Sequence, residues 1–195
     1  WTLNFLKSKG LEILWTKKNI RSYKKLLPVR KKYPNSIIIT FDDDVFYESW
    51  RVSDLVKENI NNPLSIIGYR GAEVKKDKNK KILPYKSWQN VQQQTLSENI
   101  FLTGVGGILY PPNIEFDLLI QNYSLAKKLC PYADDVFFWA ISNFLNIKKV
   151  CLLRPCIEEI YEMRNVPKLC LKNNNNLNKI NNDSQIQNCK NYFKI

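Results

Sequence analysis

The sequence predicts an α/β fold in which helices flank a mixed, mostly parallel sheet. An uninterrupted apolar run over residues 37–41 is typical of a strand that is buried on both faces. Stretches with helical spacing of apolar residues alternate with short strand-like runs along the chain. With 195 residues and 44% hydrophobic content, the chain can bury one sizeable core, so we expect residues 1–195 to form a single domain.

The first expected elements form a strand–helix–strand unit. Gly10 is suited to end a helix, and the apolar segment 11–15 is predicted to be a strand. A helix is expected over 22–27, with Ser22 as its cap, and the turn at 34–35 leads into the strand at 37–41. Strands that are joined through a helix in this way are normally parallel.

The remaining elements follow from the same two periodicities. Apolar residues at helical spacing predict helices, and short apolar runs predict strands. The expected helices cover 52–60, 116–129, 133–144 and 183–193, and the expected strands cover 64–69, 101–110 and 148–153. The lysine-rich residues 75–81 are expected to form a solvated hairpin tip, and the Asn-rich stretch 171–182 a mobile loop.

Three consecutive carboxylates, Asp42, Asp43 and Asp44, follow the apolar strand directly. They are expected at the carboxyl edge of the sheet, which is where open α/β sheets hold their ligands. In an extended backbone Asp42 and Asp44 share one side, at a spacing that suits a divalent cation, while Asp43 points the other way. The alternative is a solvated acidic turn.

Two further motifs are candidates for substrate contacts. Gly104, Gly106 and Gly107 lie within a strand-like run, where glycine marks either a close approach of a ligand to the backbone or a simple bulge. Asp134 and Asp135 begin a strongly apolar helix. Carboxylates at this position either cap the helix and complement its dipole, or act as a general base towards an acceptor hydroxyl.

Aromatic and charged residues outside these motifs indicate which kinds of partner the protein could bind. Tyr85 and Trp88 lie in a polar stretch and are either core anchors or a platform for the face of a sugar. Thirty basic residues against eighteen acidic ones give a net charge of +12, which favours anionic partners, including an anionic membrane surface. The basic residues are scattered and form no nucleic-acid module, so we expect no nucleic acid among the partners.

The composition excludes several classes of site. Histidine is absent, which rules out catalysis by Ser-His-Asp or Cys-His groups and makes the usual zinc sites untenable. The five cysteines contain no Cys-x-x-Cys pair, so reduced thiols in a cytoplasmic protein are expected. No apolar run reaches the roughly 18 to 20 residues of a membrane span.

Together, these motifs resemble those of a family of bacterial glycosyltransferases with the GT-A fold, many of which act on surface polysaccharides. The resemblance covers nearly the whole chain from Arg21 onward. It rests on the order of the segments FDDDV (41–45), RG (70–71), GVGG (104–107) followed by YPP (110–112), and CPxADDV (130–136), with YKKL (23–26) and ND (182–183) as further similarities.

The resemblance implies a nucleotide-diphosphate sugar as donor, a saccharide or lipid-linked saccharide as acceptor, and Mn²⁺ or Mg²⁺ as cofactor. It implies a cytoplasmic enzyme, either free in the cytoplasm or peripheral at the inner face of the membrane. The resemblance assigns metal binding to Asp42 and Asp44, and catalysis to Asp135 or Asp134. It assigns donor binding to Asp42, Asp43, Lys24, Lys25 and Arg70. It assigns acceptor binding to Trp88, Gly104, Gly106 and Gly107.

Two features of the sequence differ from the family pattern. The family's first strand and donor-binding turn would precede Trp1, and since the single methionine is Met163 we expect that a further N-terminal segment exists. Many of these enzymes complete the metal shell with a C-terminal histidine. In this chain water, the diphosphate or another oxygen ligand is expected to take that place.

Two alternatives from other functional classes remain. Asp42 and Asp44 at a strand end also resemble the nucleophile strand of haloacid-dehalogenase-type phosphatases, with Asp134–Asp135 and Lys128 as partners, although Phe46 departs from that motif. A non-catalytic basic module that binds nucleic acid or anionic lipid is the other alternative, and it is motivated by the net charge alone.

Overall fold

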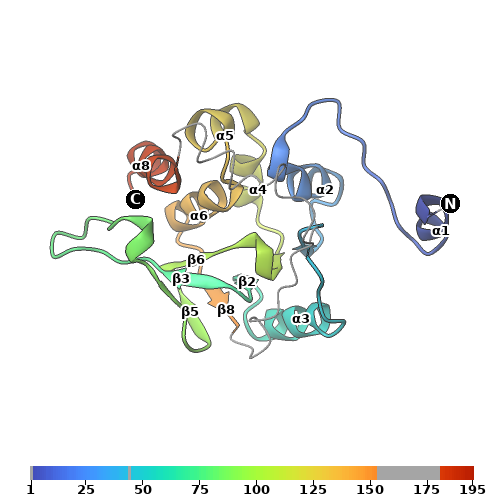
Figure 1. The fold of residues 1–195 in the computed structure, drawn as a ribbon, viewed down its shortest axis with the longest axis horizontal. Coiled ribbons are helices and arrows are strands. Elements are labelled where there is room, and N and C mark those ends of the chain that lie inside the picture. Colours follow the sequence, from blue (N-terminus) through green and yellow to red (C-terminus); the bar gives the residue numbers. More distant parts are fainter. Residues whose placement is uncertain (1, 44, 153–180) are drawn as a thin grey trace.

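The computed structural model describes residues 2–43, 45–152 and 181–195 (Figure 1). Its helices are α1 (Thr2–Ser8), α2 (Leu27–Lys32), α3 (Arg51–Asn61), α4 (Ile114–Ile120), α5 (Tyr123–Leu129), α6 (Asp134–Phe144) and α8 (Asn182–Phe193). Its strands are β1 (Ile38–Thr40), β2 (Ile66–Gly68), β3 (Gly71–Glu73), β4 (Gln89–Asn90), β5 (Thr95–Ser97), β6 (Ile100–Leu102), β7 (Ile108–Tyr110) and β8 (Lys149–Cys151). Short 3₁₀ helices cover Arg21–Lys25, Tyr85–Ser87 and Gly104–Gly106.

The strands form a mixed sheet of order β1-β7-β2-β8-β5 and a small antiparallel sheet of order β4-β3-β6. In the larger sheet β2 and β8 are parallel, with Ile67 opposite Val150, and the other three described pairs are antiparallel. The expectation of a mostly parallel sheet is therefore wrong. The reason is that β7 returns between β1 and β2 and runs against both of them.

Strand β1 is shorter and more exposed than the apolar run predicts. Among the described strands it pairs with β7 alone, so it lies at an edge of the larger sheet. Ile38 and Thr40 are buried, Ile39 is half-buried, and Ile37 is 44% exposed. Burial on both faces, as predicted, is thus found only in part: Ile38 belongs to the core under the larger helical layer, whereas Ile39 is half-buried against the core on the side of α3.

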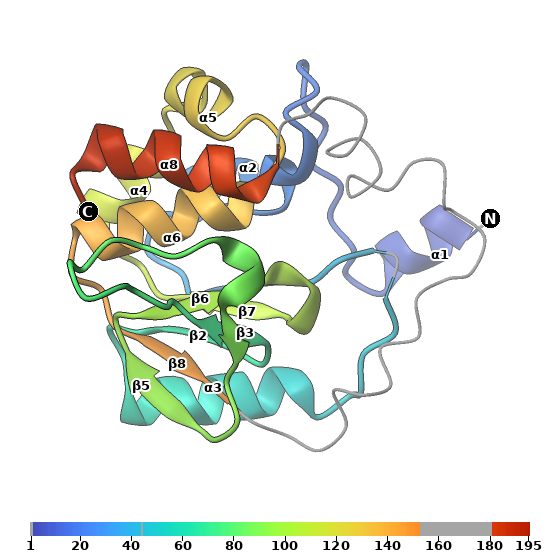
Figure 2. The ribbon, with the colours of Figure 1, turned by 60° about the vertical axis from the view of Figure 1, so that its left-hand side comes forward.

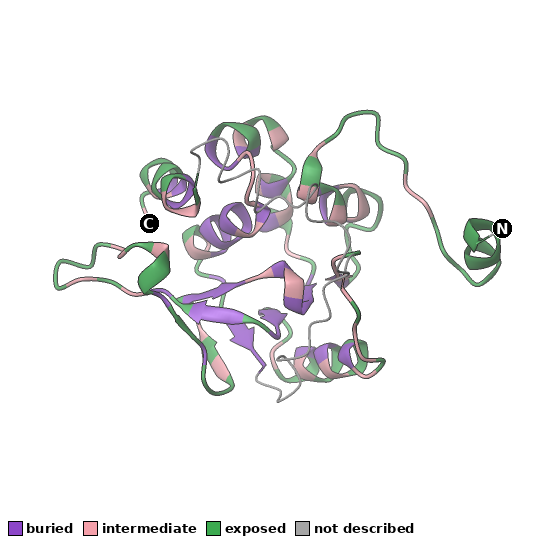
Figure 3. Cartoon of the chain, viewed as in Figure 1, coloured by how far each residue is buried: buried purple, intermediate pink, exposed green. Residues whose placement is uncertain are grey.

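Helices cover both faces of the sheets. Helices α2, α4, α5, α6 and α8 lie on one face and α3 lies on the other (Figure 2). Helix α6 is the centre of the larger layer and is buried along most of its length (Figure 3), with Phe137 and Ile141 fully inaccessible. Full burial of one such side chain contributes about 1.5 to 3 kcal/mol, so α6 is held firmly on the sheet.

The N-terminal segment departs from its predicted structure. Gly10 ends α1 as expected, with a φ of +100° that glycine tolerates. Residues 11–15 form no strand, because the described chain offers them no neighbouring strand, and Trp15 is 87% exposed. Helix α1 has no buried residue and lies apart from the main body (Figure 1).

Three predicted elements are interrupted. The helix expected over 22–27 is the 3₁₀ helix Arg21–Lys25 followed by α2. The strand expected over 101–110 is β6 and β7, separated by the 3₁₀ helix that leads from the small sheet into the large one. The helix expected over 116–129 divides into α4 and α5, because the side chain of Asn122 accepts a hydrogen bond from the amide of Leu125 and starts a new helix.

The remaining elements agree more closely with expectation. Strands β2 and β8 lie within their predicted ranges, and helix α3 exceeds its predicted range by one residue at each end. Helix α8 is capped by Asn181 rather than by Asp183, whose Oδ1 instead accepts a hydrogen bond from the amide of Tyr85 at 2.6 Å. Of the loop expected over 171–182, all but the last two residues lie outside the described residues.

The lysine-rich hairpin over residues 75–81 is confirmed. A bridge between Lys76 and Ile82 closes it, and Oδ1 of Asp77 accepts hydrogen bonds from the amides of Asn79 and Lys81 at its tip. The hairpin projects from the body of the protein (Figure 1). Across the described ranges, no helix has the length and apolar character needed to cross a membrane.

Candidate functional site

Four segments that are far apart in the sequence meet beyond the carboxyl end of β1. They are the 3₁₀ helix Arg21–Lys25, the chain that leaves β1, the 3₁₀ helix Gly104–Gly106 and the first turn of α6. We call the five residues that they bring together the carboxylate–lysine cluster: Lys25, Asp42, Gly104, Asp134 and Asp135.

The ammonium group of Lys25 lies at the centre of this cluster. Its Nζ donates a hydrogen bond to Oδ1 of Asp42 at 2.8 Å and lies 3.5 Å from Oδ2 of Asp134. Burial by itself lowers the pKa of Lys25, but the charges of Asp134, Asp135 and Asp42 outweigh burial and raise that pKa above its ordinary value. The lysine is therefore held in its protonated form among three carboxyl groups.

Asp135 has an altered proton affinity. Its Oδ2 accepts a hydrogen bond from the backbone N–H of Gly104 at 3.1 Å. Burial, together with the charge of Asp134, raises the pKa of Asp135 to about 7. A carboxyl group that titrates near neutral pH can take up and release a proton under ordinary conditions, which is what a general base requires.

The two carboxylates at the start of α6 do not cap it through hydrogen bonds. The N-cap position is held by Ala133, whose side chain cannot accept a hydrogen bond. Asp134, with its side chain 7% exposed, faces Lys25, and Asp135 faces Gly104. The side-chain capping alternative is therefore wrong, although both groups still complement the positive end of the helix dipole.

Gly104 is the glycine that borders the cluster. A Cβ atom at this position would lie 2.7 Å from Nζ of Lys25 and 3.2 Å from Oδ1 of Asp135. Any side chain here would displace one of these two groups. The absence of a side chain thus lets the backbone amide reach the carboxylate of Asp135. The group that approaches Gly104 here belongs to the protein itself, so the predicted approach of a ligand stays a prediction.

Gly106 and Gly107 contact protein instead. A Cβ on Gly106 would lie 2.9 Å from the backbone nitrogen of Arg70, and one on Gly107, whose φ is +88°, would lie 2.5 Å from the ring of Phe41. The carbonyl oxygen of Gly106 also accepts a hydrogen bond from Arg51 at 3.2 Å. These contacts favour the structural alternative for both glycines over the expected contact with an acceptor.

The chain that leaves β1 is anchored to the glycine turn. The amide of Asp42 donates a hydrogen bond to Oη of Tyr47, which in turn donates to the carbonyl oxygen of Val105, each at 3.0 Å. Asp43 is exposed, and Asp44 lies outside the described residues. The shared-metal prediction for Asp42 and Asp44 therefore stays a prediction.

The charge and the ligand chemistry of the cluster suit a divalent cation. Asp42, Asp134 and Asp135 face a single ammonium, so negative charge is in excess. Oδ2 of Asp134 is buried and makes no hydrogen bond to any described residue. Carboxylate oxygens are preferred ligands of Mg²⁺ and Mn²⁺. Because the described part of the chain holds no group of three or more ready-made ligands, a bound cation would need further oxygen atoms.

The other predicted site residues lie at the periphery or in the core. Lys24 and Arg70 are exposed. Lys24 precedes Lys25 in the chain and the backbone of Arg70 lies against Gly106, but no described contact joins either side chain to the cluster. Trp88 is buried and packs against Phe101 and Trp139, which makes it a core anchor and removes it as a sugar platform. Lys128, which the phosphatase alternative requires, is exposed on α5, and Lys25 takes the contact with Asp42.

Arg51 is a supporting residue that sequence reasoning missed. Its side chain is almost fully buried, pairs with Glu48, and stacks over Tyr69 at 4.9 Å and Trp50 at 5.5 Å while it donates to Gly106. An arginine in the first turn of an amphipathic helix is ordinarily solvated. The sequence signal that could have revealed its burial is the group of aromatic residues just before it.

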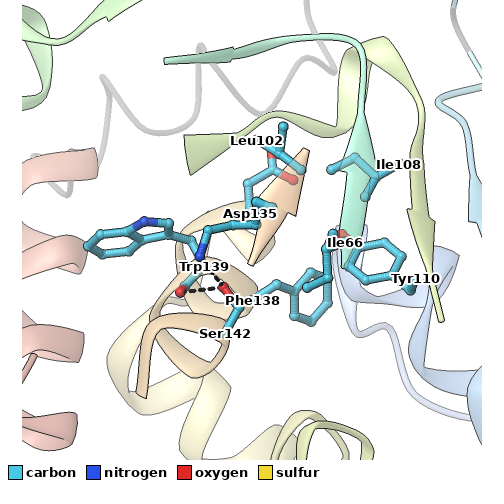
Figure 4. Close-up of a pocket in the computed structure, with 9 residues that line it drawn as sticks. Ile66, Leu102, Ile108, Tyr110, Asp135, Phe138, Trp139 and Ser142 are labelled. Atoms are coloured by element: carbon cyan, nitrogen blue, oxygen red, sulfur yellow. Dashed lines mark hydrogen bonds between the residues drawn. The ribbon is translucent and has the colours of Figure 1, made fainter. Parts of the chain in front are cut away.

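A small cavity lies behind Asp135, between α6 and the large sheet (Figure 4). Its volume is about 20 Å³, and its walls include Ile108, Tyr110 and Phe138. This space holds about one water molecule. The cavity is therefore too small for a sugar, and a substrate would have to bind on the outer side of the cluster.

Lys149 borders the same cavity and is a second buried cation that sequence reasoning missed. Its Nζ donates hydrogen bonds to Oδ1 of Asn143 at 2.6 Å, to Oγ of Ser142 at 3.2 Å and to the carbonyl oxygen of Ile147 at 3.2 Å. Burial lowers the pKa of Lys149 to about 7. Its position within a short strand gave no sign of this environment.

Comparisons with models of known protein families and with curated proteins find no match to this chain.

Proposed function

We propose that this protein transfers a sugar from a nucleotide-diphosphate donor to a hydroxyl group of a saccharide or lipid-linked saccharide, with Mn²⁺ or Mg²⁺ as cofactor and a GT-A-like arrangement of its sheet. The observation that carries the proposal is the carboxylate–lysine cluster. It combines a protonated lysine, a solvent-accessible carboxylate and a carboxyl group that titrates near neutral pH, all at the end of one strand.

The donor would bind next to Asp42. Its side chain is 27% exposed, so it can reach a ligand, and with Asp44 it would hold the cation. When bound, the cation would neutralise charge on the departing diphosphate. Lys25 is fixed within hydrogen-bonding distance of Asp42 and would add a second positive charge on the same side. Lys24 and Arg70, both exposed nearby, would attract the anionic donor.

The acceptor would bind next to Asp135. The hydrogen bond from Gly104 fixes the orientation of this carboxyl group, and its pKa of about 7 suits removal of a proton from a sugar hydroxyl. Asp134 raises that pKa through its charge and holds Lys25 in place. We therefore assign the base role to Asp135 and the supporting role to Asp134.

The test is a sugar-transfer assay combined with a thermal-shift screen. Nucleoside diphosphates and nucleotide sugars are added with and without Mn²⁺, since a ligand that binds the folded state alone raises the Tm. Asp42→Asn is expected to abolish the Mn²⁺-dependent shift. Glu115→Gln, which removes an exposed carboxylate on α4, is the matched control and should keep it. No shift with any donor, or an equal shift in Asp42→Asn, would contradict the proposal.

A further inference from the structure

Two thiol groups lie in contact beneath the C-terminal helix. Cys130 follows the last residue of α5 and Cys189 lies in α8, 59 positions further along the chain. Their sulfur atoms are 3.1 Å apart, and both side chains are fully buried. Because a disulfide requires about 2.05 Å between the sulfurs, the pair needs to close by only about 1 Å.

The backbone around the two thiols is held in place by further contacts from α8. The amide of Tyr132 donates to Oε1 of Gln185 at 3.0 Å, and Nδ2 of Asn188 donates to the carbonyl oxygen of Leu129 at 3.2 Å. The sulfur of Cys130 also lies 3.7 Å from the carbonyl oxygen of Gln185. Helix α8 is thus fitted along residues 129–132, and the closeness of the thiols is a property of the whole contact.

From this geometry we propose that Cys130 and Cys189 form a disulfide under oxidising conditions, which joins α8 covalently to the loop that leads into α6. This modification goes beyond the proposed function and does not depend on it. The loop concerned ends at Asp134, and Oη of Tyr23 donates to the carbonyl oxygen of Cys130 at 2.7 Å, so the bond would fix the segment beside the carboxylate–lysine cluster.

The chemistry is a pair of thiol–disulfide exchanges with a small-molecule disulfide such as oxidised glutathione. The thiolate of Cys189 attacks one glutathione sulfur, so that a mixed disulfide forms and one glutathione thiolate leaves. The thiolate of Cys130 then attacks the sulfur of Cys189 and releases the second glutathione. Two protein thiols are oxidised, one glutathione disulfide is reduced to two thiols, and the two protein protons pass to the leaving thiolates.

Burial makes this exchange slow in the closed structure. It raises the pKa of Cys130 well above its ordinary value and shields both sulfurs from the oxidant. We therefore expect oxidation to require partial opening of α8 or to occur during folding. Once formed, the bond restricts the unfolded chain over a loop of about 60 residues, and the expected increase in Tm is about 5 to 10 °C.

The test is to refold the full chain in reduced and oxidised glutathione and to map its disulfides. Tryptic cleavage after lysine places Cys130 in the peptide 129–148 and Cys189 in the peptide 180–190, each with one cysteine. We expect these two peptides to be cross-linked, with the mass of two hydrogens lost and the Tm raised. Recovery of both cysteines as free thiols, or as separate glutathione adducts, would overturn the proposal.

Two variants keep the result interpretable if oxidation affects another cysteine. Cys189→Ser should lose both the cross-link and the increase in Tm on oxidation. Cys151→Ser, in which another buried thiol is replaced, should keep both. An increase in Tm that persists in Cys189→Ser would assign the effect to a different pair and so contradict the proposal.

Discussion

The backbone amide of Gly104 donates a hydrogen bond to the carboxylate of Asp135 at 3.1 Å and thereby joins the turn between the two sheets to the start of α6. This contact exists because no side chain stands between the two residues. The orientation of the proposed base therefore depends on a residue that has no side chain.

Replacing Gly104 tests this dependence. In Gly104→Ala the added methyl group would lie 2.7 Å from Nζ of Lys25, a flexible group that can move, so the protein should fold with little loss of stability. A displacement of about 1 Å in the cluster is expected to lower turnover by up to about 10²-fold. In the comparison variant Gly106→Ala, the methyl group meets the backbone of Arg70, and a stability loss of about 1 to 3 kcal/mol is expected. Turnover and urea unfolding of both variants distinguish the two effects.

The pair Asp134 and Asp135 should separate into a supporting and a catalytic residue. Because asparagine cannot accept the proton, Asp135→Asn is expected to lower turnover by about 10² to 10⁴-fold. Asp134→Asn should have a smaller effect on turnover and should weaken the hold on Lys25. Both variants should remain folded by circular dichroism. Near wild-type turnover in Asp135→Asn would contradict the assignment of Asp135 as the general base.

The raised pKa of Asp135 also has a consequence for stability. Between the ordinary pKa of aspartate and about 7, the folded state binds more protons than the unfolded state at this position, so its contribution to stability falls as the pH rises through that range. Asp135→Asn removes this dependence. The variant should therefore gain stability relative to the wild type from pH 4 to pH 7, as measured by urea unfolding without metal. A constant difference between the two proteins would contradict the assigned pKa.

Lys149 should produce the opposite dependence on pH. Its pKa is lowered to about 7 by burial, so between pH 7 and its ordinary value near 10.5 the unfolded state binds more protons and stability rises with pH. The slope is at most about 1.4 kcal/mol per pH unit. Because the thiols of the unfolded chain also titrate in this range, the quantity to measure is the difference in the free energy of unfolding between wild type and Lys149→Met. As the pH rises, the free energy of unfolding of the wild type should increase relative to that of Lys149→Met.

Arg30 should be among the residues whose loss costs the most stability. Its guanidinium is buried, forms an ion pair with Asp117 at 2.9 Å, and donates to the carbonyl oxygens of Ser36, Tyr110 and Pro111. Arg30→Met leaves the half-buried carboxylate of Asp117 without its partner and three carbonyl oxygens without their donor, for which about 3 to 5 kcal/mol is expected. Replacement of the exposed Lys31 by Met is the matched control and should change stability by less than about 0.5 kcal/mol.

The sequence predicted the local elements better than their assembly. Helix α3, strand β2 and the lysine-rich hairpin follow from periodicity and turn residues, which act over a few positions. The insertion of β7 between β1 and β2 depends on pairing between segments about 70 residues apart, on which local pattern has no bearing. The apolar run at 37–41 therefore indicated a strand but not its place at the edge.

The candidate site was predictable in part for the same reason. Asp42, Asp134 and Asp135 could be singled out because carboxylates at a strand end and at a helix start are conspicuous. That Lys25 rather than Lys24 reaches them depends on the 3₁₀ geometry of its turn, and the burial of Trp88 depends on contact with α6. Neither property is expressed in local sequence.

The projecting hairpin over residues 75–81 offers a practical handle on the protein. Its tip is held by the side chain of Asp77, which accepts two backbone hydrogen bonds, and by backbone hydrogen bonds from Asp77 to Lys81 and from Lys80 to Asp77. Its lysines are in large part exposed. Exposed tips of this kind tolerate insertion better than any other part of a domain. An affinity tag or a fluorophore inserted at Lys78 would therefore allow the protein to be immobilised or labelled. The pairing of the strands in the larger sheet, next to which the carboxylate–lysine cluster lies, should not change.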